Sequence, residues 1–336
     1  MSSSVSIIVC TYGRAAALGV VLDCLNVQDY RDFEVLIIDG NAGDKTSARD
    51  AVEKALGKEN FRIPIRLIQS PKGLTRQRNV GLAEAKGDLI CFLDDDVSFG
   101  PDFLSQFVGI FQSPEAANVG GITGYDPLNY SAPVTMRWRM KKFLGAIPSL
   151  EPGDVDHLGR AVTVSFLAPW AGHREIGWLP GFCMIYRRAA IEGLQFDEKL
   201  PTYGGEDRDF SMYVGSRWKL WICGDLLVNH HGAQPGRDSH LHRAYQTGFG
   251  TARRFAKSAS TAGDYATIAK TFAGDVLVDV LTFLSKPTYS NGMTVFVRTK
   301  GFCAGWASCE ARRPYAPRSS KEISLETENR NPASVK

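Results

Sequence analysis

The sequence predicts an α/β protein built on a mostly parallel, Rossmann-like sheet with helices on both faces. In the N-terminal third, short apolar β-branched runs alternate with stretches in which apolar residues recur at helical spacing. The runs are apolar throughout, which is typical of parallel strands buried on both faces. The chain has 336 residues, 44% of them hydrophobic and 22% charged, which is enough to bury a substantial core.

The first part of the chain gives the clearest elements. Strands are expected over 5–11, 33–39, 63–69 and 88–96, and helices over 14–28, 44–57 and 75–86. In sheets of this kind, ligands bind outside the carboxyl ends of the strands. The polar residues at those ends, Thr11, Asp39 and Asp94–Asp96, are therefore the first candidates for a site.

The second part is less regular. Residues 120–180 are rich in Gly, Pro and aromatic residues and give no assignment. Residues 179–194 predict a strand followed by a helix, and 219–225 predict a last strand. Between them, 206–218 predict a helix because its apolar residues recur at intervals of four: Phe210, Val214 and Trp218.

Composition excludes several classes of protein. The 39 Lys and Arg against 36 Asp and Glu leave a net charge of +3, too little for a chain-wide nucleic-acid surface, so no nucleic-acid partner is expected. Seven scattered cysteines without a CxxC pair, and no signal peptide, predict the cytoplasm. The most apolar stretch, 267–284, contains Lys270, Asp275 and Asp279, so it is not expected to span a membrane.

The strongest local feature is the triplet Asp94–Asp96 after an apolar strand. Carboxylates this close raise one another's pKa unless a positive charge compensates, and Mg²⁺ or Mn²⁺ suits oxygen ligands. If strand geometry persists, Asp94 and Asp96 point to one side and Asp95 to the other. The alternative is a solvated acidic turn or a helix N-cap.

Segment 73–81 places Arg76, Arg78 and Asn79 in the first turns of an expected helix. A planar guanidinium suits bidentate contact with a phosphate or a base carbonyl. A solvated helix face is the alternative, and this segment taken alone favours that alternative.

Segment 204–210 places Glu206 and Asp207 at a helix N-terminus. The helix dipole favours acids there, which is a sufficient structural explanation. The functional alternative is a carboxylate that projects into a cleft and acts as a general base.

Two adjacent histidines, His230 and His231, follow the last expected strand. Adjacent residues in a strand point to opposite sides, so one of them can complete an oxygen-rich metal site with a nitrogen ligand. A structural histidine is the alternative.

In this order and spacing, the motifs resemble glycosyltransferase family 2, on the GT-A fold. The resemblance covers roughly residues 5–232 and is carried by SIIVCTYGR, IDGNAGD, GLTRQRNVGLAEAKGDLICFLDDD and LPGFCMIYRRAAIEG…FDEKLPTYGGEDRDF. It implies transfer of a sugar from a nucleoside diphosphate donor, with inversion and with Mn²⁺ or Mg²⁺ as cofactor. UDP is the default, although Gly40 stands where many members carry a second acid.

The resemblance also implies roles, position by position. Donor-binding residues would be Thr11, Tyr12, Arg14, Asp39, Arg78, Asn79, Asp94 and Asp95. The metal ligands would be Asp94, Asp96 and His231. Asp207 matches the catalytic base, with Glu206 beside it.

The resemblance divides the chain as well. Residues 1–232 would be the catalytic domain, with a nucleotide-sugar-binding half (1–120) and an acceptor-binding half (121–232). We expect a mostly helical extension over 233–310 and a disordered tail over 311–336.

The acceptor is expected to be a saccharide or a lipid-linked saccharide of polysaccharide biosynthesis. Basic and aromatic residues interleave in 132–145 and again in 251–257, a composition that suits an anionic lipid surface and peripheral contact with the inner face of the membrane. An alternating strand with one solvated face is the alternative. No QxxRW-type stretch is found (246–250 reads QTGFG), so one sugar per acceptor is expected.

Two other functions stay open. A sugar-nucleotidyltransferase also binds a nucleotide with acids and Mg²⁺, but TYGRAAALG is a poor version of its phosphate loop. An inactive nucleotide-sugar-binding protein is the second alternative, and the intact acids argue against it.

Overall fold

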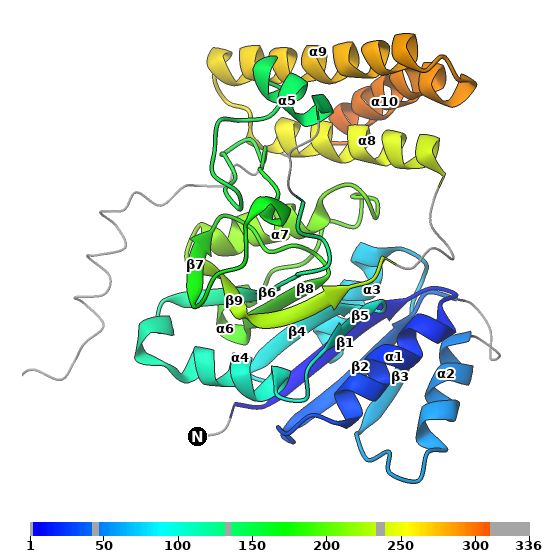
Figure 1. The fold of residues 1–336 in the computed structure, drawn as a ribbon, viewed down its shortest axis with the longest axis vertical. Coiled ribbons are helices and arrows are strands. Elements are labelled where there is room, and N and C mark those ends of the chain that lie inside the picture. The colour runs from blue at the N-terminus through cyan, green and yellow to red at the C-terminus, as the bar shows by residue number, and fades with distance from the viewer. Residues whose placement is uncertain (1–2, 42–46, 132–135, 233–238, 310–336) are drawn as a thin grey trace, which may run out of the picture.

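The computed structural model describes residues 3–41, 47–131, 136–232 and 239–309 (Figure 1). These residues form one sheet with the strand order β3-β2-β1-β4-β8-β6-β9-β5, and β7 pairs with β9. The strands are β1 (Val5–Thr11), β2 (Phe33–Asp39), β3 (Ile65–Gln69), β4 (Leu89–Asp94), β5 (Val97–Phe99), β6 (Val119–Tyr125), β7 (His173–Ile176), β8 (Cys183–Arg187) and β9 (Lys219–His230).

Most strands run in one direction. β1 is parallel to β2 and β4, and β2 is parallel to β3. β8 runs antiparallel between β4 and β6, whereas β6 and β9 are parallel. β5 and β7 are antiparallel to β9. The predicted fold class, a mostly parallel sheet in an α/β protein, is confirmed.

Helices cover both faces of the sheet, and others lie at one end of the molecule. The described α-helices are α1 (Ala15–Asn26), α2 (Ser47–Leu56), α3 (Leu74–Glu84), α4 (Phe103–Gln112), α5 (Met136–Phe143), α6 (Arg188–Ile191), α7 (Glu206–Gly215), α8 (His240–Ser258), α9 (Ala262–Ser285) and α10 (Tyr289–Ala307). Leu18 of α1 and Phe107 of α4 pack with Val9 in one core. Ile8 and Phe210 of α7 belong to the core on the other face. Apolar strands buried on both sides explain these two cores.

Helix α3 lies very close to the sheet. A Cβ at Gly81 would stand 2.4 Å from Cγ2 of Ile8, so only glycine permits this approach. The close packing sets the first turns of α3, with Gln77 and Arg78, at the carboxyl ends of β1 and β4.

The last three described helices form a unit at one end of the molecule (Figure 1). Helix α10 packs so tightly along α8 that the contact requires glycine. A Cβ at Gly301 would stand 2.3 Å from the carbonyl oxygen of Tyr245, and a Cβ at Gly305 would stand 2.1 Å from that of Phe249. The expected helical extension is thus present, whereas the whole of the expected tail, 311–336, lies outside the described residues. None of the described helices is both long enough and apolar enough to cross a bilayer.

Two details differ from the sequence-based expectation for the basic segments. Residues 136–143 form helix α5, so the alternative of an alternating strand is wrong for them, and 132–135 lie outside the described residues. The basic residues of 251–257 are not a surface for lipid: Arg253, Arg254 and Lys257 are at most 8% exposed and bond to residues within 197–209.

Candidate active site

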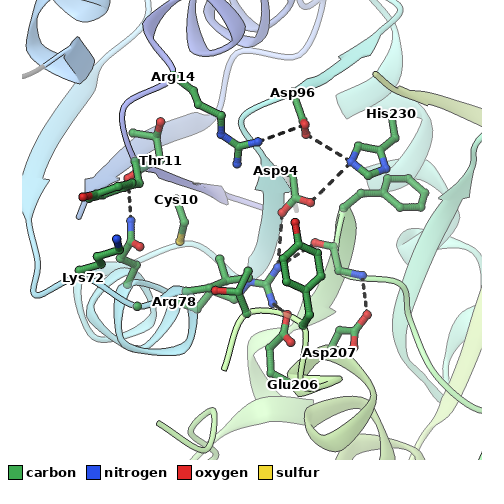
Figure 2. A pocket seen from close by; sticks show the side chains of 18 of the residues that line it. Cys10, Thr11, Arg14, Lys72, Arg78, Asp94, Asp96, Glu206, Asp207 and His230 are labelled. Atoms are coloured by element: carbon green, nitrogen blue, oxygen red, sulfur yellow. Dashed lines mark hydrogen bonds and ion pairs between the residues drawn. The ribbon is translucent and has the colours of Figure 1, made fainter. Parts of the chain in front are cut away.

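A cavity of about 620 Å³ opens at the carboxyl ends of β1 and β4, between α3, α7 and the end of β9 (Figure 2). The residues that line it are Cys10, Thr11, Tyr12, Arg14, Lys72, Gly73, Leu74, Gln77, Arg78, Asp94, Asp96, Gly181, Phe182, Thr202, Tyr203, Glu206, Asp207, His230 and Arg243. Its position is the one expected for ligands of a parallel sheet.

Asp94, Asp96 and His230 face one another on one wall of the cavity (Figure 2). Nε2 of His230 lies 3.3 Å from Oδ1 of Asp96 and 4.0 Å from Oδ2 of Asp94. One ligand atom from each of the three residues lies within 4.8 Å of the others. Two carboxylates and an imidazole are a donor set that Mn²⁺ accepts readily and Mg²⁺ less so, so the residues fit a divalent cation.

The charges around these acids shift their protonation. Burial raises the pKa of Asp94, although Arg78 and His230 oppose the shift. Burial lowers the pKa of His230, but its hydrogen bond to Asp96 and the charge of Asp94 outweigh it, so the net direction is upward. The ring of His230 stacks on Phe182, with centroids 5.4 Å apart, which fixes its orientation.

The structure places His230, and not the expected His231, beside the acids. Nε2 of His231 instead forms a hydrogen bond of 2.7 Å with the hydroxyl oxygen of Ser98. β9 continues to His230, and His230 has the same strand parity as the buried Leu226 and Val228. That spacing of two is a signal in the sequence that could have identified His230.

Asp95 points away from the cavity, as expected, but it does so in the turn after β4 rather than in a continued strand, and it is fully buried. It accepts a hydrogen bond of 2.6 Å from Thr11 and pairs with Arg14 at 2.8 Å. Burial raises its pKa to about 7. Because Arg14 also pairs with Asp96 at 3.2 Å, Asp95 supports the cavity wall from behind rather than lining it.

Arg78 is buried at the centre of the site (Figure 2). Its guanidinium donates to Glu206 at 3.0 Å, to Asp94 at 3.5 Å and to the carbonyl of Gly181 at 3.0 Å. It therefore links the acids at the end of β4 to the start of α7.

Asp207 lies in the first turn of α7, after Gly205 in the left-handed conformation (φ 77°). Its Oδ2 accepts a hydrogen bond of 3.0 Å from the backbone N–H of Gly181, so the Gly181 peptide joins Asp207 to Arg78. Burial and the charge of Asp207 raise the pKa of the neighbouring Glu206 to about 8, against the effect of Arg78. Glu206 is thus turned inward toward Arg78, while Asp207 is the more accessible of the pair.

The remaining expected residues are divided between the cavity and its surroundings. Tyr12 lines it and carries the ammonium group of Lys72 over its ring at 4.1 Å. Asp39 lies behind the wall, fully buried, and its Oδ2 has no hydrogen-bond partner among the described residues. Asn79 does not line the cavity: it holds both backbone groups of Phe196, at 2.8 and 3.0 Å.

Several lining residues carry no signal in the sequence pattern. Gln77 donates to the carbonyls of Thr11 and Ile38, which ties α3 to the ends of β1 and β2. Tyr203 and Arg243 come from the loop before α7 and from α8, and Arg243 lies over the Tyr203 ring at 6.0 Å. Only the tertiary fold brings these segments to the cavity.

The chain is similar to known glycosyltransferases. The sequence model described as Glycosyl transferase family 2 matches residues 6–167. The amylovoran biosynthesis glycosyltransferase AmsB of Erwinia amylovora is 31% identical over 232 residues, 68% of this chain and 69% of that protein.

Two solved structures show the same type of fold. The mannosyltransferase PcManGT of Pyrobaculum calidifontis, in complex with GDP-Man and Mn²⁺, has a TM-score of 0.51 at 16% identity, over 98% of this chain and 80% of that one. S. aureus TarS 1-349, in complex with UDP-GlcNAc, has a TM-score of 0.52 at 16% identity, over 90% and 81%.

Proposed function

Because the chain belongs to glycosyltransferase family 2, we propose that this glycosyltransferase is metal-dependent and transfers one sugar with inversion from a nucleoside diphosphate donor to a saccharide or lipid-linked saccharide. Polysaccharide biosynthesis is the process we propose for it. One observation carries the proposal: Asp94, Asp96 and His230 line the same cavity as Asp207.

The acids and His230 would hold the cation, which would stabilise the negative charge that develops on the departing diphosphate. Thr11, Tyr12, Arg14 and Arg78 would contact the donor from the rest of the wall. Lys72, over the Tyr12 ring, adds a further positive charge at the same side of the cavity. Asp39 and Asp95 would act from the layer behind.

Asp207 would take the proton of the acceptor hydroxyl. As the hydroxyl oxygen bonds to the anomeric carbon, the bond from that carbon to the diphosphate breaks, and the nucleoside diphosphate leaves with its electron pair. The hydrogen bond from Gly181 holds the Asp207 carboxylate in place for this transfer. Glu206, directed at Arg78, would position rather than react.

The nucleobase is the open part of the proposal. A Cβ at Gly40 would stand 3.0 Å from Oε1 of Gln77, so Gln77 occupies the space that a second acid would need. The solved structures with similar folds bind GDP-Man and UDP-GlcNAc, so both bases need testing.

The proposal is tested by incubating the protein with UDP- and GDP-sugars and following released products with Mn²⁺, with Mg²⁺ and with EDTA. We expect free nucleoside diphosphate, formed only with the metal. A parallel incubation with a nucleoside triphosphate and a sugar phosphate tests the first alternative, because a nucleotidyltransferase would release pyrophosphate from them. Metal-dependent donor binding with no product from any donor would favour an inactive nucleotide-sugar-binding protein.

A further inference from the structure

The three-helix unit has an outward face that no described part of the chain covers. On α9, residues at a spacing of three and four stand exposed: Leu277 by 43%, Leu281 by 38% and Leu284 by 68%. Tyr289, at the start of α10, is 80% exposed, and Phe143, at the end of α5, is 89% exposed. Large side chains exposed together in this way mark an interaction surface. We call these five residues the outer apolar face.

Helix α5 belongs to the same surface because it packs along α9. Lys141 pairs with Asp275, and a Cβ at Gly274 would meet Ala146 at 2.9 Å and Leu144 at 3.4 Å. Figure 1 shows α5 beside the N-terminal half of α9, the described helix farthest from the sheet. Phe143 therefore stands near the α9 stripe.

The charge that accompanies this face is positive. Each carboxylate of α5, α9 and α10 is already paired: Asp264 with His157 at 2.7 Å, Asp275 with Lys141, and Asp279 with Arg298 at 2.6 Å. The exposed charged side chains of these helices and of the turn between α9 and α10 are all basic: Arg139, Lys142, Lys270, Lys286 and Lys300.

We propose that the outer apolar face docks on an anionic lipid bilayer, with Arg139, Lys142 and Lys270 facing the headgroups and the apolar side chains entering the interface. Apolar burial together with attraction between basic residues and anionic lipid is the combination that holds peripheral proteins on membranes. A second copy of this chain would carry the same positive charge, and self-association would bring like charges together.

The docking surface deepens the proposed function, because a face of this kind would bring the cavity to lipid-linked acceptors. Of the two basic segments that the sequence suggested for such a surface, only one belongs to it. Segment 132–145 contributes through α5, whereas the basic residues of 251–257 are buried within the protein. The exposed leucines of α9, Leu277, Leu281 and Leu284, form the rest of the proposed surface.

The test is flotation of the full chain with vesicles of equal parts phosphatidylglycerol and phosphatidylcholine, and with phosphatidylcholine alone, at low salt. We expect flotation only with the anionic vesicles. The pairs Leu277→Glu/Leu284→Glu and Arg139→Glu/Lys142→Glu should each reduce the floated fraction by about fivefold or more. Leu56→Glu and Lys54→Glu on α2 are matched exposed controls and should float as the wild type does.

The proposal is overturned if the wild type stays at the bottom of the gradient with anionic vesicles, or if the face variants float unchanged. A concentration-dependent dimer that is lost in Leu277→Glu/Leu284→Glu, without flotation, would assign the face to a second copy instead. Flotation is read without any enzyme assay. Metal-dependent release of nucleoside diphosphate, measured without vesicles, should be unchanged in the face variants. The two assays therefore distinguish a failure of membrane docking from a failure of the proposed transferase function.

Discussion

Lys257 of α8 donates hydrogen bonds to both carboxylate oxygens of Asp209, each at 2.9 Å, and Asp209 lies in the same first turn of α7 as Asp207. Both partners are buried. Beside them Arg253 pairs with Asp197, and Arg254 donates to the carbonyl of Gly204 just before α7. The helical unit thereby holds the segment that carries the proposed base.

Lys257→Met should be strongly destabilising. It removes a buried ammonium group that pairs with both Asp209 and Asp197, a change that costs roughly 3 kcal/mol of unfolding free energy. Urea denaturation measures the loss. Lys270→Met, a change of the same type at an exposed position of α9, should stay within about 0.5 kcal/mol of the wild type. Equal stability of the two variants would show that the Lys257 contact does not hold α7.

Asp197 should make the protein sensitive to acid. Burial raises its pKa, but hydrogen bonds and charges from Arg253 and Lys257 outweigh burial and lower the pKa to about 2. The unfolded chain has a value of about 3.9. The stabilisation is therefore complete above about pH 4 and is lost as the pH falls toward about 2.

As the pH falls from about 4 toward about 2, the unfolding free energy of Asp197→Asn should decrease by roughly 2 kcal/mol less than that of the wild type. Denaturation curves between pH 5 and pH 2.5, about the range over which the group titrates, measure it. Asp23→Asn, which removes an exposed partner of Lys58, should leave the slope unchanged. An unaltered slope in Asp197→Asn would refute the assignment.

Asp207→Asn should keep donor binding and lose transfer. The amide accepts the Gly181 hydrogen bond but does not take the acceptor proton, so kcat should fall by about 10²–10⁴-fold. Affinity for the nucleoside diphosphate, measured by calorimetry with Mn²⁺, serves as the internal control. Turnover near the wild-type rate would remove Asp207 from the role of base.

Gly181→Ala tests the peptide that joins Arg78 to Asp207. The new Cβ would stand 3.2 Å from Nη2 of Arg78 and 3.4 Å from Oδ2 of Asp207, so one of these groups must move. We expect kcat to fall by roughly tenfold to a hundredfold, with thermal stability changed little. Gly109→Ala on α4, where a Cβ meets nothing within 4 Å, should leave kcat unchanged.

The sequence pattern was sufficient to predict elements whose bounds are set by residues adjacent in the chain. β1 and β2 have the predicted bounds because their apolar runs end at Thr11 and Asp39. Strand 88–96 was predicted too long, since the chain turns after Asp94 to form β5.

Pattern was insufficient where partners are distant in the chain. The basic residues of α8 look solvent-exposed in isolation, but Lys257 pairs with Asp209, 48 residues earlier. β9 was predicted to end at 225, which hid the parity that directs His230 to Asp96. Arg243 reaches the cavity because α8 packs against the loop before α7, where a Cβ at Gly250 would stand 2.1 Å from the carbonyl oxygen of Gly204.

The most direct test of the site is calorimetric titration of UDP and of GDP, with and without Mn²⁺, into the wild type, Asp96→Ala, His230→Ala and His231→Ala. We predict that one nucleotide binds only with Mn²⁺, that Asp96→Ala and His230→Ala weaken binding by at least about tenfold, and that His231→Ala binds as the wild type does. Binding that is indifferent to Mn²⁺, or unchanged in Asp96→Ala, would contradict the account.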